Sequence, residues 1–190
     1  MKDNQIIVLC GFSSVGKDSI AEILNKEYGY NYTISTTTRP MRNYESQRNP
    51  YIFTTNKEFE KLIKENKLIE YRSYNTLVNN CPATWYYGIE KKELLEDRAY
   101  VTVVDILGMR ELKKQYPNRV KTFFIQVDDN IRKQRCIQRG NFDETEWNRR
   151  LQDDKQKFSP EVINKEFDFI ISNIDLNKTV KEIIDKVGYR

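Results

Sequence analysis

The chain has 190 residues, of which 38% are hydrophobic, and its 32 basic and 28 acidic residues give a formal net charge of +4. This length suits one domain with room for an inserted segment, the mixed charge gives no reason to expect a nucleic-acid partner, and the absence of histidine excludes imidazole chemistry. No apolar stretch approaches the roughly 20 residues that span a bilayer, and the first residues do not resemble a signal peptide, so we expect a cytoplasmic protein without a membrane partner.

Strands and helices are expected to alternate along the chain. We expect strands over residues 6–10, 100–105, 120–127 and 167–172. We expect helices over residues 19–28, 108–116, 129–139, 144–158 and 176–187, with Pro117 and Pro160 placed after two of them. The interval 36–92 differs, because it has short strand-like pieces, one helical stretch over 56–66 and many tyrosines. Near-continuous apolar strands between helices predict an α/β fold whose parallel sheet is covered on both faces.

The segment between the first strand and the first helix is a candidate phosphate-binding loop. It runs Gly11-Phe12-Ser13-Ser14-Val15-Gly16-Lys17. Glycines let the backbone aim its N–H groups at phosphate oxygens, and Lys17 and the helix dipole add positive charge. Such a motif also occurs by chance in a simple turn, but the strand and helix on either side favour a nucleoside triphosphate site.

Asp18 departs from this motif, which ordinarily has Ser or Thr at that position to contact Mg²⁺. A carboxylate beside phosphates is tolerable when Mg²⁺ bridges the two, directly or through water, or when the side chain turns away. Alternatively, Asp18 is an acidic first-turn residue that complements the helix dipole. Both interpretations stay open, and Asp18 is our candidate metal contact.

A second group of polar residues follows in the inserted interval. Arg39 and Arg42 are three residues apart, with Glu45 and Tyr51 further on. Two guanidinium groups and a phenol could surround a single phosphate, since arginine binds phosphate oxygens in bidentate fashion. The alternative is a solvated basic loop with a packed tyrosine.

Taken in order, these residues and several later ones resemble the guanylate kinase family over nearly the whole chain. The residues that carry the resemblance are Ser35, Thr38, Arg39, Arg42, Glu45, Tyr51, Phe53, Glu70, Tyr87-Gly88, Asp105, Gly108, Arg135, Arg139-Gly140, Arg149-Arg150-Leu151 and Asn173. The resemblance implies a P-loop NTPase-type core (1–35, 93–134 and 159–190), an inserted nucleoside-monophosphate-binding subdomain (36–92) and a helical lid (135–158). It also implies transfer of the γ-phosphoryl group of ATP to GMP or dGMP, with Mg²⁺ as cofactor.

The resemblance assigns roles to individual residues. The implied ATP-binding residues are Gly11, Ser13, Ser14, Val15, Gly16, Lys17, Asp18, Ser19, Arg135 and Asn173. The implied GMP-binding residues are Ser35, Arg39, Arg42, Glu45, Tyr51, Glu70, Tyr87 and Asp105. The implied catalytic residues are Lys17, Arg39, Arg135, Arg139 and Arg150. Arg149 competes with Arg150 for one role, because adjacent helical residues point about 100° apart, and Asp105 is also a candidate helix N-cap.

Two departures leave base choice open. Ile89 replaces the Ser or Thr that usually follows Tyr-Gly and contacts O6 of guanine, and residues 72–86 form a longer stretch than the family has, which we expect to be a loop. The alternatives to a guanylate kinase are therefore a nucleoside monophosphate kinase with altered base specificity and a non-catalytic interaction module. Such a module has little need for Lys17 or the lid arginines. The oligomeric state stays open.

Overall fold

The computed structural model describes residues 4–41, 45–48, 51–78, 81–95, 97–138, 140 and 142–188. Two residues singled out above, Arg42 and Arg139, lie outside these described residues. None of the helices in the described ranges is both long and apolar enough to span a membrane.

The larger sheet has five strands in the order β2-β7-β1-β8-β9, and all of its pairings are parallel. Its strands are β1 (Ile6–Gly11), β2 (Asn31–Tyr32), β7 (Tyr100–Val103), β8 (Val120–Gln126) and β9 (Phe169–Ser172). This arrangement confirms the α/β fold and the parallel sheet expected from the sequence. The strand expected over 100–105 ends at Val103, because Asp105 caps the next helix.

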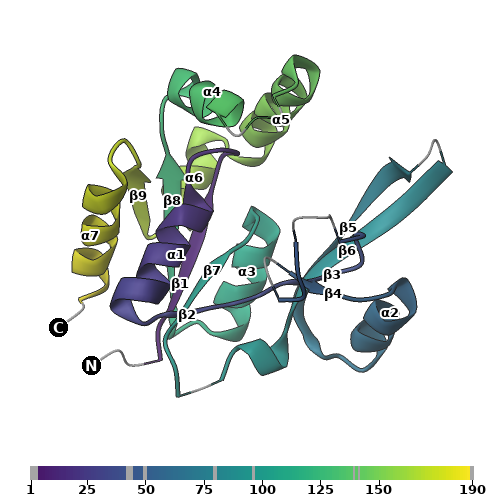
Figure 1. The fold of residues 1–190 in the computed structure, drawn as a ribbon. Coiled ribbons are helices and arrows are strands. Elements are labelled where there is room, and N and C mark those ends of the chain that lie inside the picture. The colour runs from purple at the N-terminus through teal and green to yellow at the C-terminus, as the bar shows by residue number, and fades with distance from the viewer. Residues whose placement is uncertain are drawn as a thin grey trace.

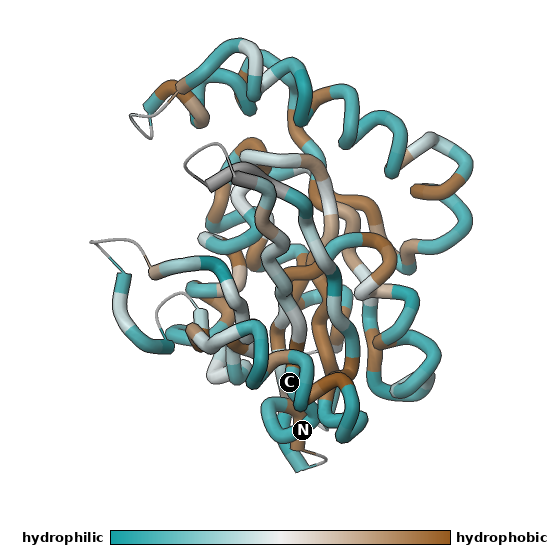
Figure 2. The backbone as a smooth tube through the Cα atoms, turned by 90° about the vertical axis from the view of Figure 1, so that its right-hand side faces the viewer, coloured by the Kyte–Doolittle hydropathy of each residue, from teal (hydrophilic) through white to brown (hydrophobic). Residues whose placement is uncertain are grey.

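Helices cover both faces of this sheet. They are α1 (Lys17–Tyr28), α3 (Ile106–Gln115) and α7 (Leu176–Val187). Alternate residues of β1 point to opposite faces, so Ile7 and Leu9 pack with α1 and α7, whereas Ile6 and Val8 pack with α3. Figure 2 shows the result as hydrophobic strands in the interior with largely hydrophilic helices outside them.

A second, four-stranded sheet is built from the inserted interval, in the order β4-β3-β6-β5. Its members are β3 (Thr36–Thr37), β4 (Ile52–Phe53), β5 (Leu68–Val78) and β6 (Cys81–Glu90), with the helix α2 (Asn56–Lys64) between β4 and β5. The expectation of a long loop over 72–86 was wrong, since most of this stretch is an antiparallel pair of strands. Aromatic side chains explain the difference, because Tyr74 lies opposite Trp85 and packs edge-on against Tyr87, and such contacts favour strand pairing.

The remaining helices are α4 (Asp129–Gln138), α5 (Glu144–Lys157) and α6 (Pro160–Glu166), and a short 3₁₀ turn covers Lys91–Glu93. In Figure 1, α4 and α5 lie at the top and the β5–β6 hairpin lies at the right. The sequence pattern does not predict helix α6, because a proline that follows the helix expected over 144–158 indicates the end of that helix. Proline fits the first turn of a helix instead, and the hydroxyl of Ser159 caps α6 by accepting from the N–H of Val162.

Candidate active site

The loop that joins β1 to α1 depends on unusual backbone conformations. Gly11 has φ +146, and a Cβ there would lie 2.1 Å from the carbonyl oxygen of Ile125 in β8. Gly16 has φ +95 and stands at the N-cap of α1, while Ser14 has φ +62. Positive φ values within such a loop turn successive backbone N–H groups to one side, which creates a concave site for an anion.

Lys17 lies at the start of α1 and bends back over this loop. Its Nζ donates to the carbonyl oxygens of Gly11 and Phe12, at 2.9 and 2.8 Å. Burial lowers the pKa of the Lys17 ammonium, and the neighbouring Asp18 carboxylate acts in the opposite direction. The Lys17 amino group is therefore held against the backbone of the loop.

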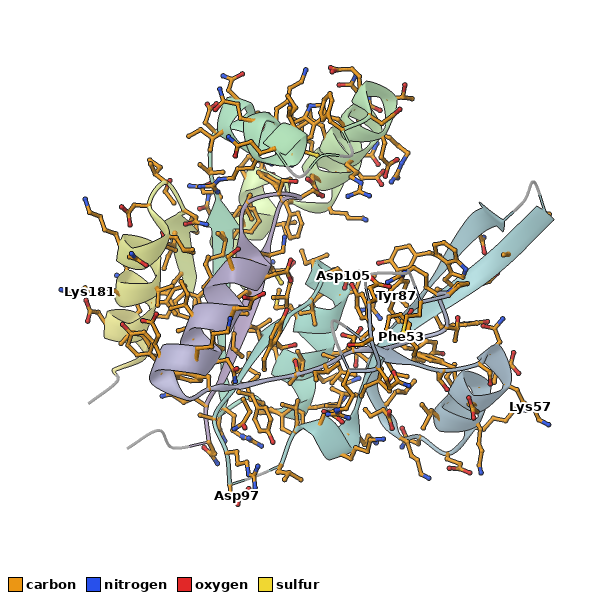
Figure 3. All side chains as sticks on the ribbon, in the orientation of Figure 1. Phe53, Lys57, Tyr87, Asp97, Asp105 and Lys181 are labelled. Carbon is orange, nitrogen blue, oxygen red and sulfur yellow. The ribbon has the colours of Figure 1, made fainter. Side chains whose placement is uncertain are left out.

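A cavity of about 980 Å³ connects this loop to the small sheet and to α5. Among its lining residues are Ser13, Lys17, Asp18, Ser35, Tyr51, Glu70, Arg72, Tyr87, Asp105, Glu146, Arg149, Arg150 and Asp154. The labelled side chains of Tyr87 and Asp105 lie near each other where the small sheet meets the core (Figure 3). Residues from distant parts of the sequence thus share one space.

Arg39 lies behind the wall of this cavity. Its Nη2 donates to both oxygens of Glu45, at 2.7 and 3.0 Å, and both side chains are buried. The rings of Tyr51 and Phe53 each lie 5.5 Å from the guanidinium carbon. The tyrosine ring in turn packs edge-on against Tyr87, with ring centroids 5.7 Å apart. This packing fixes the position of the Tyr51 ring in the cavity wall.

Three charged side chains meet where β5 approaches α3. Nη1 of Arg72 lies 3.8 Å from Oε2 of Glu70, and Nε of Arg72 lies 3.4 Å from Oδ2 of Asp105. The other oxygen of Asp105 accepts from the N–H of Gly108 at 2.8 Å, so Asp105 is also the N-cap of α3. Burial raises the pKa of Glu70 to about 7, Arg72 opposes this shift, and Asp105 adds to it. The carboxyl groups were predicted, whereas Arg72 was not.

A smaller cavity of about 300 Å³ lies on the other side of the phosphate loop, between Gly16, Arg135 and Asn173. Arg135 donates to the carbonyl oxygens of Val15 and Asn173, at 3.1 and 2.9 Å. The Asn173 amide donates to the same Val15 oxygen at 2.7 Å. The Oδ1 of Asn173, a residue that lines this cavity, is buried and has no hydrogen-bond partner within the described residues. Ser19 also lines this cavity.

A buried ion pair between α4 and α5 was missed by the sequence analysis. Nη2 of Arg132 lies 2.5 Å from Oδ2 of Asp154, and the same oxygen accepts from the N–H of Ser13 at 2.8 Å. Nε of Arg132 donates to the Ser13 carbonyl at 2.8 Å, and its guanidinium carbon lies 4.8 Å from the Phe12 ring centre. Nothing in the spacing of charges along these helices distinguishes this pair from solvated residues.

Arg149 and Arg150 share one acidic partner on α5. Arg149 donates to both oxygens of Glu146 and to Asp153, and Nε of Arg150 donates to Glu146 at 2.6 Å. Both arginines line the large cavity and are more than half exposed. The assignment of Arg150 rather than Arg149 to phosphate contact stays a prediction.

Asp18 faces the same cavity from the first turn of α1, and its Oδ1 accepts a hydrogen bond from the Tyr32 hydroxyl at 3.1 Å. No group of three carboxylate or thiol ligands suited to a metal ion occurs among the described residues. A site of one carboxylate completed by substrate phosphates is common for Mg²⁺, and the position of Asp18 fits that kind of site.

Known proteins resemble this chain in sequence and in fold. The model of the family described as guanylate kinase matches residues 3–187. A guanylate kinase of Rickettsia felis is 33% identical to this chain, and the match covers 94% of this chain and 90% of the relative. A guanylate kinase of Synechocystis is 28% identical, and the match covers 97% of this chain and 93% of the relative. The crystal structure of guanylate kinase from Anaplasma phagocytophilum shares the fold, with a TM-score of 0.67, 20% identity, and coverage of 99% of this chain and 86% of that chain. The chain therefore belongs to the guanylate kinase family.

Proposed function

We propose that this chain transfers the γ-phosphoryl group of ATP to GMP or dGMP. The observation that carries the proposal is the single cavity that joins the Lys17 loop, the tyrosines of the small sheet and the arginines of α5. We assign residues 1–35, 93–134 and 159–190 to the core, 36–92 to the acceptor subdomain and 135–158 to the lid. As ATP is the co-substrate, we expect the enzyme to act in the cytoplasm.

The donor site that we propose is the phosphate loop with the smaller cavity beside it. Backbone N–H groups of the loop and the Lys17 ammonium would hold the β- and γ-phosphates. The unpartnered oxygen of Asn173 supports adenine binding, because the exocyclic amine of adenine is a donor. Arg135 holds the carbonyl groups on both sides of that cavity in place.

The acceptor site that we propose lies on the small sheet. The hydroxyl groups of Tyr51 and Tyr87 would donate hydrogen bonds to the phosphate of GMP. Arg39 would join them when the phosphate competes with the Glu45 carboxylate for its guanidinium. Glu70 would accept from N1–H and the exocyclic amine of guanine, two donors that adenine does not present in that arrangement. Ser35 and Asp105, which also line the cavity, would contact the base or sugar.

The reaction needs little proton chemistry. The phosphate oxygens of GMP are already ionised near neutral pH, so no general base is required, and a chain without histidine can catalyse the transfer. The protein's part is to align donor and acceptor, exclude water and place positive charge around the transferred group. Lys17 and the arginines of α5 carry that charge, and Arg139 is assigned the same role.

Mg²⁺ is the cofactor that we propose. When bound, it would neutralise charge on the β- and γ-phosphate oxygens. Asp18 would hold it, directly or through water, because this carboxylate and Lys17 line the same cavity.

The test is a coupled assay with ATP and a panel of GMP, dGMP, AMP, dTMP and IMP, with and without Mg²⁺. We expect Mg²⁺-dependent ADP formation with GMP and dGMP. No ADP above background with any acceptor would overturn the proposal and favour the interaction module. Preferred turnover of a nucleoside monophosphate with another base would favour a kinase with altered base specificity, an alternative supported by the burial of Ile89.

A further inference from the structure

In the part of the proposed acceptor site that would hold the guanine base, the guanidinium of an arginine lies between two carboxylates. Arg72 reaches both Glu70 and Asp105, at 3.8 and 3.4 Å. Glu70 is about nine-tenths buried, and the Arg72 side chain is 22% exposed. All three side chains line the large cavity.

Two ionised carboxylates cannot read guanine completely. Glu70 and Asp105 only accept hydrogen bonds when ionised, whereas guanine presents acceptors at O6 and N7 beside its N1–H donor. O6 therefore needs a donor located next to the group that binds N1–H. Arg72 is two residues from Glu70 on β5, so both side chains point to the same face of that strand.

The residue that follows Tyr87-Gly88 cannot supply this donor. Ile89 has no hydroxyl, is 0% exposed and packs in the core cluster with Ile69 and Leu94. On the opposite strand, Arg72 pairs in register with Tyr87, which also lines the cavity. Position 89 therefore supplies no donor, whereas Arg72 places a charged donor nearby on the neighbouring strand.

The guanidinium of Arg72 retains unused hydrogen-bonding capacity. Nη1 donates to the carbonyl oxygen of Tyr71, which anchors one edge of the group. Nε is buried and makes no hydrogen bond to any described residue. Its ion-pair partner is Oδ2 of Asp105 at 3.4 Å, a contact without hydrogen-bond geometry, so the buried N–H is not fully satisfied in the free protein and a base carbonyl would satisfy it.

We propose that Arg72 determines base specificity by donating to the O6 and N7 edge of guanine while Glu70 binds N1–H and the amine. This inference rests on the acceptor site proposed above. Arginine pairs with the same two guanine atoms when proteins read DNA, where one good pair discriminates against a wrong base by about 10- to 100-fold.

The experiment compares wild type, Arg72→Ala and Arg72→Gln with two acceptors, GMP and 6-thio-GMP. The thio analogue keeps N1–H and the amine but replaces O6 by a weakly accepting sulfur. Wild type is expected to lose about tenfold or more in kcat/KM when sulfur replaces oxygen. The kcat/KM of Arg72→Ala with GMP should be lower than that of wild type by a similar factor, and this variant should discriminate little between the two acceptors. The values for Arg72→Gln should lie between those of wild type and Arg72→Ala.

Arg98→Ala is the matched control, since it removes an arginine that is more than half exposed and lies outside the cavity. It should leave both acceptors unaffected. Binding of GMP alone, measured by calorimetry, separates this inference from the proposed function. A wild type that binds GMP without phosphorylating it contradicts the proposed function, and weaker binding by Arg72→Ala then still supports the inference. Unchanged or tighter GMP binding by Arg72→Ala, or no binding by wild type, would overturn it.

Discussion

The carboxylate of Asp154, in the last turn of α5, accepts a hydrogen bond from the backbone N–H of Ser13 in the phosphate loop at 2.8 Å. One of its oxygens thus joins the proposed lid to the loop, and the buried guanidinium of Arg132 neutralises it. A loop built to bind anions here binds an anion supplied by the protein itself. The contact orders the loop and α5 together.

Asp154→Asn should destabilise the protein by about 3 kcal/mol, because it leaves Arg132 buried with its charge only partly compensated. Urea unfolding followed by circular dichroism would measure the change. Asp153→Asn, one residue earlier on the same helix, removes an exposed partner of Arg149 and should cost less than about 0.5 kcal/mol. Equal effects of the two substitutions would contradict a structural role for the buried pair.

Lys17→Met should reduce kcat by about 10³-fold, because it removes a positive charge that contacts the phosphate loop and lines the large cavity. Steady-state kinetics at saturating ATP and GMP would measure the loss, and the melting temperature should change little. Lys26→Met, in the last turn of the same helix, removes an exposed lysine and should retain full activity. Substantial activity of Lys17→Met would exclude Lys17 from the transfer step.

The rate with GMP should fall on acidification through pH 7. Burial raises the pKa of Glu70 to about 7, and protonation removes its ability to accept both guanine donors. Below this pKa, kcat/KM for GMP should therefore fall by about tenfold per pH unit. In Glu70→Gln this inflection should disappear, leaving only the titration of the substrate phosphate near pH 6. An identical pH profile for the two proteins would show that Glu70 does not bind the base.

Asp18→Ser should raise the Mg²⁺ concentration needed for half-maximal rate several-fold, because a hydroxyl is a weaker ligand than a carboxylate. Titration of Mg²⁺ at fixed ATP would measure it. Tyr32→Phe is the control, since it removes the hydrogen bond to Asp18 while keeping the carboxylate. If Asp18→Ser leaves both the rate and the Mg²⁺ dependence unchanged, Asp18 only complements the helix dipole.

The sequence predicted those features that are determined locally. Apolar strands such as β1 and the strongly amphipathic α7 were placed within one residue, because their patterns match their burial. Helix α6 was missed since its proline was read as a terminator, although Ser159 before it is a good N-cap. The β5–β6 hairpin was not predicted because the resemblance implies a loop for the extra residues, although Tyr74 and Trp85 are residue types that favour strands.

The sequence singled out those cavity-lining residues that have characteristic neighbours in sequence, as Lys17 and Tyr87 do. Arg72 was missed because its importance depends on strand register, which places it on the same face as Glu70. Arg132 and Asp154 are 22 residues apart and meet only when α4 packs beside α5. Contacts of this kind depend on tertiary structure, so local sequence patterns do not reveal them.

The lack of space for a side chain at Gly11 affects how mutational surveys of this chain should be interpreted. A side chain there would collide with the carbonyl oxygen of Ile125 before any nucleotide arrived, so its replacement should lower the amount of folded protein in the cell. Replacement of Lys17 should lower turnover per molecule instead. A growth-based screen would score both positions as intolerant, and only a parallel measurement of abundance would separate a defect of the sheet from a defect of the reaction.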